Sequence, residues 1–433
     1  MLQTLRNAWK VEEIRKKILF TLLIVLLYRL GNAIPVPYVN VSLLQNYFDT
    51  VQNTVLGLLD VMSGGAFSTA TIFALSIQPY INASIIIQLL CIAIPALERL
   101  SKDEGEEGRK KIASITRYAT VGIGLLQGFG YYMLIKNNNF LVSYAQNNIW
   151  AAIVIILTFT SGSALIMWLG EQITEFGIGN GISIILFVNI LSSGFATAET
   201  IVNQIKKGGF ANIFFAILSV IIMVAVITLV VFITNSERRI PVQYAKRVVG
   251  RKMYGGQNSN LPLKLNMSGV MPIIFASSIV SLPTTIGLFV QPKTGSFWAK
   301  FLDLFSPSSV VYVLLFIALI IAFSYFYIEI SFNNVEVANN LKKNGGFIPG
   351  FRAGKPTSEF IQKVLNKITL FGAIYLSVIA ITPLIISACS QAEQLTGISL
   401  GGTSIIIVVG VALETVRALE AQMLMRNYKG FLS

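Results

Sequence analysis

The residue types that most often perform covalent chemistry are scarce in this sequence. It contains no His and only two Cys, Cys91 and Cys389, and both Cys lie inside long apolar stretches. Cys residues in such a setting are usually buried free thiols, so we expect neither a disulfide nor a metal site. Without a metal-binding cluster or a nucleophile paired with a base, the sequence predicts a protein that is not an enzyme and needs no cofactor.

Two glycine-containing stretches resemble nucleotide-binding loops but lack the required spacing. Residues 177–181 read GIGNG, which is not G-x-G-x-x-G, and no alternation of strands and helices surrounds them. Residues 350–356 read GFRAGKP, with one residue too few between the glycines and Pro in place of Ser or Thr. We therefore predict a tight turn at the first stretch and no nucleotide site at either.

The most informative polar residues interrupt the apolar stretch 56–97. These residues are Gln78, Asn82, Ser84 and Gln88. Unpaired polar groups are costly in lipid, so we expect this helix to border an internal cavity, with Pro79 removing one helical hydrogen bond near mid-span. The apolar segment before it contains Asp60 and is too short to span. Gly64 and Gly65 would let the backbone turn after that half-helix.

The composition places most of the chain in a membrane. Of its 433 residues, 54% are hydrophobic and 12% are charged, whereas a soluble protein has about 25% charged residues. Ten windows of roughly 20 apolar residues can be drawn. They are 18–33, 70–97, 112–135, 149–169, 182–201, 211–233, 269–290, 310–330, 368–388 and 404–423. The window 182–201 is the weakest, because it contains Asn189, Ser192, Ser193 and Gly194. The sequence therefore predicts an all-α polytopic membrane protein with ten transmembrane helices.

The net charge of +13 is distributed in a way that predicts topology rather than nucleic-acid binding. Most Lys and Arg residues fall in loops that the ten spans place on one side. Those groups lie within 6–17, 99–111, 238–264, 342–367 and 417–429. Positive loops face the cytoplasm, so both termini are expected there. Arg29 and Arg117 fall inside predicted spans.

Two of these cytoplasmic loops, 235–268 and 331–367, are unusually long. Structureless connections beyond about 15 residues usually have a task. Both loops are rich in basic residues, with Tyr254, Phe347 and Phe351 interleaved. In the first loop, Gly255-Gly256 indicates a reversal between two extended arms. We favour a docking surface for a large cytoplasmic partner over a passive connection.

A short internal sequence repeat relates two predicted halves, 1–205 and 206–433. Residues 79–84 and 272–277 both read P-x-I-x-A-S, and each lies in the second span of a half. Because each half has five spans, the halves would cross the membrane in opposite directions, as inverted repeats do. Ion-coupled secondary transporters share this layout, and they remain the alternative. They usually need acidic residues at the membrane midplane, and the second, fifth and seventh spans contain none.

Several long motifs resemble the SecY family, whose members are the central subunits of the bacterial protein-conducting channel. The motifs include IPVPYVN (34–40), SGGAFSTATIFALSIQPYINASIIIQLL (63–90), WLGEQITEFGIGNGISII (168–185) and RRIPVQYAKR (238–247). The resemblance covers nearly the whole chain. It implies two five-helix halves around an hourglass pore, which passes unfolded secretory polypeptides and releases apolar segments sideways into lipid.

The resemblance also implies roles for individual positions. It assigns a hydrophobic pore ring to Ile77, Ile81, Leu186, Ile190, Ile274 and Ile407. It assigns a plug to residues 56–68, with Leu58, Val61, Met62 and the hinge at Gly64 and Gly65. A lateral gate would include Asn82, Gln127 and Ser278. Docking of a motor or ribosome would use Lys246, Arg247 and Arg352.

The implied partners are other members of a secretion system. They are the membrane subunits SecE and SecG, the ATP-driven motor SecA, the ribosome, signal-bearing precursor proteins and membrane lipid. The implied location is the bacterial cytoplasmic membrane.

Overall fold

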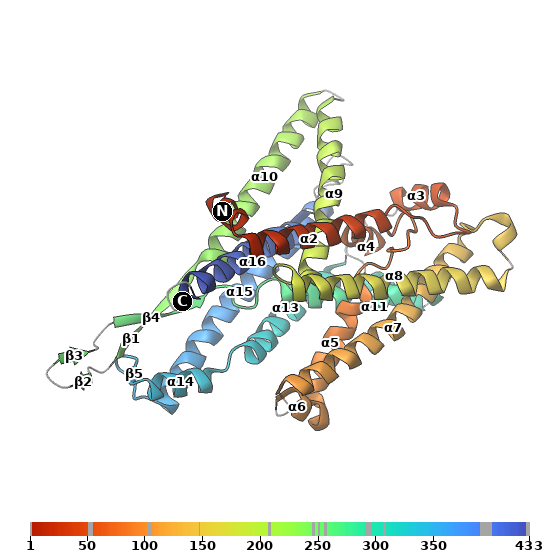
Figure 1. Ribbon diagram of the computed structural model, residues 1–433. Helices are drawn as coiled ribbons and strands as arrows, with labels where there is room; N and C mark the ends of the chain where they lie inside the picture. Colours follow the sequence, from red (N-terminus) through yellow and green to blue (C-terminus); the bar gives the residue numbers. More distant parts are fainter. Residues whose placement is uncertain are drawn as a thin grey trace.

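The computed structural model describes residues 2–50, 55–102, 105–146, 148–206, 209–244, 247–249, 252–254, 258–290, 297–305, 309–389 and 401–429. Each predicted span overlaps a helix (Figure 1). The helices are α2 (Glu12–Gly31), α5 (Gln78–Ala93), α7 (Gly105–Asn137), α8 (Ile149–Phe176), α9 (Gly181–Lys206), α10 (Phe210–Asn235), α11 (Met271–Val290), α13 (Val310–Ser331), α15 (Lys355–Cys389) and α16 (Gly401–Lys429). The prediction of ten membrane helices is confirmed.

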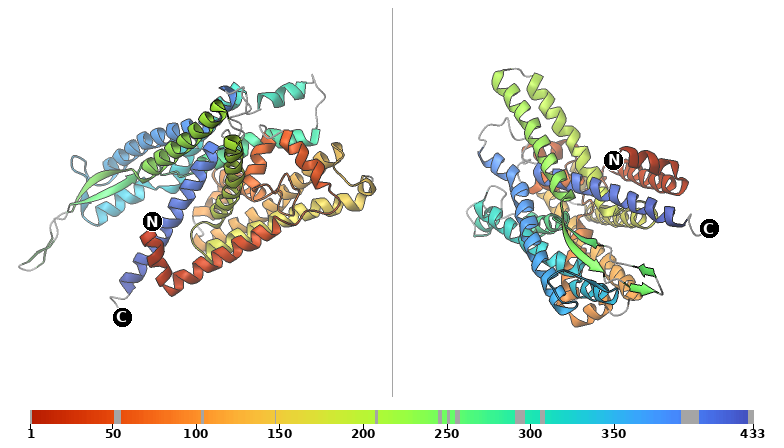
Figure 2. Two further views of the ribbon diagram at one scale, coloured as in Figure 1. Left: turned by 90° about the horizontal axis from the view of Figure 1, so that it is seen from above. Right: turned by 90° about the vertical axis from the view of Figure 1, so that its left-hand side faces the viewer.

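Shorter helices connect the long ones. They are α1 (Leu2–Lys10), α3 (Val41–Thr50), α4 (Val55–Ser63), α6 (Pro95–Lys102), α12 (Phe297–Leu304), α14 (Asn334–Lys343) and a 3₁₀ turn at Ser143–Ala145. Helices α9 and α10 form a hairpin that projects from the rest of the molecule in both Figure 1 and Figure 2. The predicted boundary between halves, at residue 205, falls at the end of α9.

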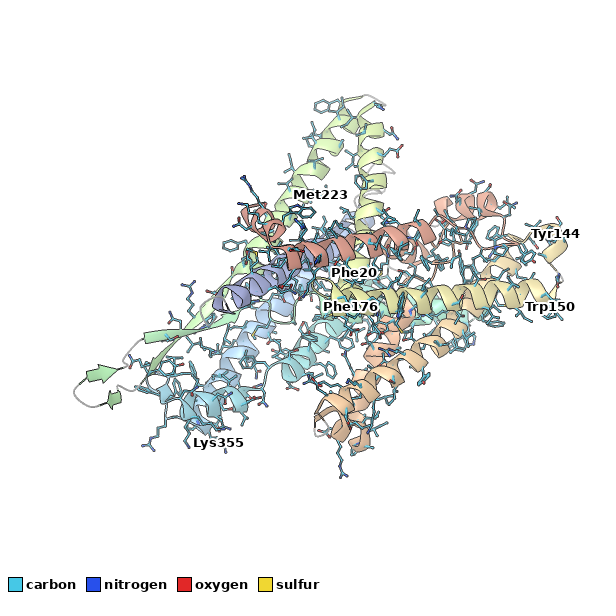
Figure 3. The ribbon with its side chains drawn as sticks, in the orientation of Figure 1. Phe20, Tyr144, Trp150, Phe176, Met223 and Lys355 are labelled. Atoms are coloured by element: carbon cyan, nitrogen blue, oxygen red, sulfur yellow. The ribbon has the colours of Figure 1, made fainter. Side chains whose placement is uncertain are left out.

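The long helices pack in two groups that meet along a seam. In the first group α7 contacts α5 and α8, and α8 contacts α2 and α9. The aromatic rings of Phe20 in α2 and Phe176 in α8 meet edge to face, with 6.1 Å between centroids (Figure 3). In the second group α13 lies between α11 and α15, and α16 contacts α10 and α15. Helix α11 contacts α5 and α7, and α16 contacts α9, so the two groups share one interface.

The second span differs from its prediction, because helix α5 begins at Gln78 and not near residue 70. Ala70 and Ser76 have positive φ angles of 44° and 50°, which a helix does not allow. The backbone of this buried, non-helical segment bonds to the segment after α2. The Val36 amide donates to the Ala70 carbonyl at 2.9 Å, and the Ile72 amide donates to Ile34 at 3.0 Å.

The prediction that Pro79 interrupts a helix at mid-span is wrong. Pro79 occupies the first turn of α5, where an amide has no intrahelical partner and proline costs nothing. Pro272, the equivalent residue in the second copy of the repeat, is likewise the second residue of α11. Both copies of the P-x-I-x-A-S pattern therefore open a helix.

Three helices have apolar runs shorter than a full membrane span. Four helices in the described part of the chain are long and apolar enough to cross a membrane by length and composition alone. The apolar runs Gln78–Ala93, Gly181–Phe195 and Met271–Pro283 are shorter, and they belong to α5, α9 and α11.

Both basic residues inside predicted spans have partners. The Arg29 guanidinium donates to the carbonyl oxygen of Val188 in α9. Arg117 in α7 forms an ion pair with Glu171 in α8 at 3.0 Å. Each contact joins two helices, as expected for charged groups at membrane depth.

The two long loops combine into a single unit, which makes the fold less than purely α-helical. Strands β1 (Glu237–Tyr244) and β4 (Asn258–Lys264) pair antiparallel, as predicted for extended arms, and β5 (Gly346–Phe347) pairs with the other edge of β1. Strands β2 (Arg247–Val249) and β3 (Lys252–Tyr254) form a separate ladder at the tip. The predicted reversal at Gly255-Gly256 lies outside the described residues. We call β1, β4, β5, α14 and the first part of α15 the cytoplasmic unit, after the side of the membrane on which the charge pattern predicts them.

Two helical glycines provide a test of the packing. A methyl group at Gly162 in α8 would overlap the carbonyl oxygen of Ile72, whereas one at Gly122 in α7 would meet no atom within 4 Å. We expect Gly162→Ala to lower the free energy of unfolding by about 1–3 kcal/mol through overpacking. Gly122→Ala should raise it by up to about 1 kcal/mol through helix propensity. Thermal unfolding in detergent measures both, and equal midpoints would contradict the packing of α8 on residue 72.

Candidate pore and plug

The six predicted ring residues are all buried in the structure. All six belong to one buried hydrophobic cluster, which we call the central cluster. They come from the start of α5, from α9, α11 and α16: Ile77, Ile81, Leu186, Ile190, Ile274 and Ile407. Ile77 and Ile81 share a face, because the Ile81 amide donates to the Ile77 carbonyl at 3.1 Å. Aliphatic residues from both groups of helices therefore meet at the interface between the groups.

The predicted plug segment contains helix α4, whose end is hydrogen-bonded to α9. The last carbonyls of a helix have no intrahelical partner. Asn189 Nδ2 donates to the Met62 carbonyl at 3.0 Å, and Ser193 Oγ donates to the Val61 carbonyl at 3.2 Å. The Met62 side chain belongs to the central cluster, and its sulfur accepts from Gln78 Nε2 at 3.3 Å. Helix α4 thus touches the cluster that contains the ring residues.

The two glycines end the plug helix as predicted. Gly64 and Gly65 have φ angles of 72° and 84°, which side chains rarely adopt. The Gly65 amide donates to the Asp60 carbonyl at 2.9 Å, in the manner of a left-handed helix end. The Asp60 carboxylate accepts from the Ser68 amide at 2.7 Å. Asp60 therefore has a structural task in the turn.

The helical part of the plug is shorter than the predicted range 56–68. Helix α4 ends at Ser63, and Phe67 packs in a second hydrophobic cluster within the first group of helices. Its ring stacks on Tyr131 with 4.2 Å between centroids, and the Tyr131 hydroxyl donates to the Phe67 carbonyl. Residues after Gly65 are thus part of the core of the first group. The side chain of Leu58 lies outside the described residues.

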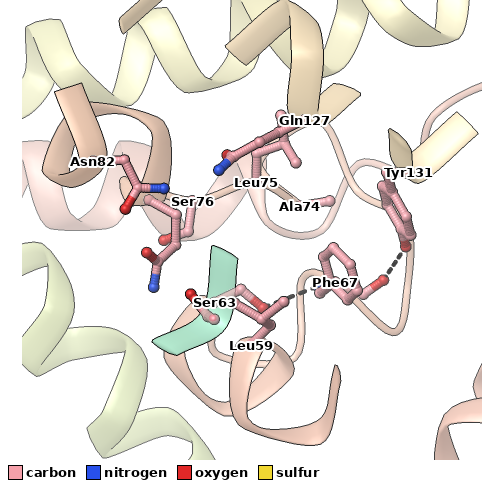
Figure 4. Close-up of a pocket in the computed structure, with 11 residues that line it drawn as sticks. Leu59, Ser63, Phe67, Ala74, Leu75, Ser76, Asn82, Gln127 and Tyr131 are labelled. Atoms are coloured by element: carbon pink, nitrogen blue, oxygen red, sulfur yellow. Dashed lines mark hydrogen bonds between the residues drawn. The ribbon is translucent and has the colours of Figure 1, made fainter. Parts of the chain in front are cut away.

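A small cavity with both apolar and polar lining lies where α4, α5, α7 and α11 approach one another (Figure 4). Its volume is about 30 Å³, which suits one or two waters. Two of the predicted gate residues, Asn82 and Gln127, face it together with Ser281. Ser278 lies one helical turn earlier on α11, buried, and its hydroxyl has no hydrogen-bond partner among the described residues. Ser281 is the α11 residue that sequence reasoning missed.

The predicted docking residues Arg352 and Arg247 lie on different elements. Arg352 is exposed on the loop between β5 and α15, where its carbonyl accepts from Thr357 Oγ1 at 2.8 Å. Next to it, the rings of Phe351 and Phe360 pack with 4.1 Å between centroids. Arg247 lies in β2 at the tip, and Lys246 lies outside the described residues. On β4, burial and the nearby Arg417 guanidinium lower the pKa of Lys264.

Sequence reasoning missed the residues that fasten the plug. Asn189 and Ser193 make the predicted span 182–201 less apolar. This polarity was the available sequence signal for a contact inside the protein. A polar residue in a membrane helix indicates a partner without identifying it. The partner, a carbonyl at the end of α4, is more than a hundred residues away in the sequence.

The fold and the site define a multi-pass membrane channel with an apolar centre and a short helix seated against it. A model of the SecY family matches residues 71–416. A "Protein translocase subunit SecY" from Streptomyces scabiei is 44% identical over 448 residues, covering 100% of both chains. The chain belongs to the SecY family and is a protein-conducting translocation channel of the bacterial membrane. An ion-coupled transporter is not favoured.

Solved structures share the fold at low sequence identity. "The structure of a protein conducting channel" has a TM-score of 0.68 and 17% identity, covering 94% of this chain and 92% of that one. A structure described as showing that the plug domain of SecY stabilises the closed channel has a TM-score of 0.66 and 16% identity, with 94% and 92% covered. Sec61 in the canine ribosome–channel complex has a TM-score of 0.64 and 16% identity, also with 94% and 92% covered.

A substitution in the central cluster tests the ring. Ile274→Ser removes apolar surface and adds a hydroxyl, which should disfavour the closed state by about 1–3 kcal/mol. Precursors with weak signals should then pass more readily in a proteoliposome translocation assay. Ile155→Ser is the control, because Ile155 is equally buried but packs in the second cluster. Equal leak and equal signal tolerance in the two variants would remove Ile274 from the pore.

Proposed function

We propose that the six ring residues of the central cluster form the constriction through which unfolded polypeptide passes. The supporting observation is that Ile77, Ile81, Leu186, Ile190, Ile274 and Ile407, which come from four separate helices, meet in one cluster that also contains Met62 of α4. An apolar constriction excludes water and ions by dewetting. Flexible aliphatic side chains can part around a chain and close behind it.

Helix α4 is proposed as the plug that blocks this constriction at rest. It is short, apolar and held by two hydrogen bonds from α9. Gly64 and Gly65 give it a hinge, and the following segment stays anchored in the first group through Phe67. Displacement of α4 would therefore leave the core of the first group intact.

The lateral gate is proposed to be the seam where α5 and α7, on one side, face α11 on the other. Asn82, Gln127 and Ser281 meet there across a water-sized cavity. Polar side chains make a weaker seam than an apolar core does, since water can replace their contacts. Ser278 lies on the same helix, one turn from Ser281. Apolar segments of a precursor would leave through this seam into lipid.

The cytoplasmic unit is proposed as the docking surface for SecA or the ribosome. It joins both long loops in one sheet, has its own hydrophobic core and presents Arg352 and Phe351 outward. A solved Sec61 of the same fold was bound to a ribosome. The assignment of Lys246 and Arg247 to this surface rests on the family resemblance. SecE would brace the two halves, 1–205 and 206–433, with SecG at the periphery.

The positive-inside rule supports a topology with both termini in the cytoplasm. In this arrangement the cytoplasmic unit and the loop that contains α6 face inward. Helix α4 then enters from the outer side, opposite the docking surface. Signal-bearing precursors would approach from the side of the cytoplasmic unit.

Removal of the plug helix tests its role. Because Phe67 belongs to the core, the replacement should cover Val55–Ser63 only, with a Gly/Ser linker of equal length. We expect the inserted protein to conduct small ions at rest, because the apolar constriction loses its stopper. Conductance across planar bilayers measures this leak, and a resting conductance equal to that of the unmodified chain would contradict the plug.

Charge reversal at Arg352 tests the docking surface. Arg352→Glu should abolish ATP-driven translocation with SecA while changing the unfolding free energy by less than about 0.5 kcal/mol. Lys110→Glu reverses a charge at an exposed site of α7 outside the cytoplasmic unit, so it is the control. Precursor transport at the unmodified rate in Arg352→Glu would show that the basic loop serves topology alone.

A further inference from the structure

A buried polar layer adjoins the central cluster on the side of the plug. It consists of Tyr28 in α2, Asn32 just after it, Ser76 before α5, and Asn189 in α9. Tyr28 and Asn189 are each 0% exposed. The Tyr28 hydroxyl lies close to the side chains of the other three residues, but none of them meets it with hydrogen-bond geometry. Buried amides and hydroxyls are costly unless they are paired, so this layer requires an explanation beyond packing.

One amide of the layer is engaged with the plug. Asn189 Nδ2 donates to the Met62 carbonyl at 3.0 Å and to Ser76 Oγ at 3.1 Å. The fit is close, because a side-chain carbon at Gly64 would come within 3.1 Å of Asn189 Cα. Asn189 therefore links α9 both to the end of α4 and to the segment that precedes α5, while Ser193 bonds to α4 alone.

Other polar atoms of the layer are unused in this arrangement. Tyr28 Oη, Asn189 Oδ1 and both amide atoms of Asn32 are buried and lack hydrogen-bond partners among the described residues. If α4 left, the Asn189 amide would lose the Met62 carbonyl. A buried donor without an acceptor is expensive. Tyr28 Oη and Asn32 Oδ1 are acceptors within the same layer.

We propose that Asn189 is a positioning residue that latches the plug, and that Tyr28 and Asn32 accept its hydrogen bond when the plug leaves. The inference rests on the proposed role of α4. In the closed channel Asn189 bonds to Met62, and in the open channel it bonds within the layer. Because the amide is paired in both states, neither state is strongly penalised, and a modest stimulus shifts the population.

Substitutions at Asn189 and Tyr28 should shift the equilibrium between the closed and open states in opposite directions. Asn189→Leu conserves volume but removes the donor, so the closed state loses its latch and the resting ion leak should rise roughly tenfold. Tyr28→Phe removes a hydroxyl that is unused in the closed state and needed in the open one. It should leave the resting leak unchanged and lower the frequency of opening by a signal-bearing precursor roughly threefold. Single-channel recording in planar bilayers measures both quantities.

Three comparisons make the outcome decisive. Ser192→Ala, on the same helix as Asn189, should leave the leak unchanged, and a leak equal to that of Asn189→Leu would overturn the latch. A rise in leak with Tyr28→Phe would show that the layer acts only through packing, and would overturn it as well. In the chain whose α4 is replaced by the linker, Asn189→Leu should add no further leak.

The same linker variant separates the two proposals. If it leaks and Asn189→Leu does not, the latch is wrong while the plug stands. If the linker variant does not leak, the plug is wrong and the latch is overturned with it. Thermal midpoints of all variants in detergent identify any that fail to fold, and Asn189→Ser, which keeps a donor, should restore part of the seal.

Discussion

The structure depends on one constraint: inside a membrane, polar groups must find their partners within the protein. The non-helical segment before α5 meets this constraint through the backbone of residues 34–36. Arg29 meets it through a carbonyl of α9, and Arg117 meets it through Glu171. Each solution joins elements that are distant in sequence. The need to satisfy polar groups therefore builds the tertiary structure as much as apolar packing does.

The apolar centre must seal the membrane and still admit a chain, and these demands conflict. A well-packed core is rigid and costs several kcal/mol to open. This channel divides the task among small contacts: aliphatic side chains from four helices, a short helix, and hydrogen bonds to its last carbonyls. In the proposed function each contact is weak enough to break separately, while together they would close the pore.

The cytoplasmic unit is connected directly to helices that border the centre. Strand β1 begins two residues after α10 ends, and β4 ends seven residues before α11, which contains Ile274. Strand β5 precedes α15 and pairs with β1, so the sheet joins three membrane helices. If this sheet is the docking surface, as proposed, a bound partner would act on a unit that is continuous in the chain with α10, α11 and α15.

The sequence alone determined the membrane class, the ten spans and the half-helix, because apolar runs of fixed length and basic loops are local signals. Through matched motifs it also predicted the ring residues, all six of which the structure buries in one hydrophobic cluster. Only the tertiary structure decided where Pro79 lies, since a proline at mid-span and one in a first turn look alike in sequence. It also decided the union of the two loops through β5, and the contact between Asn189 and Met62. Those features depend on pairs of residues far apart in the chain, and a single sequence contains no signal that specifies which polar group meets which.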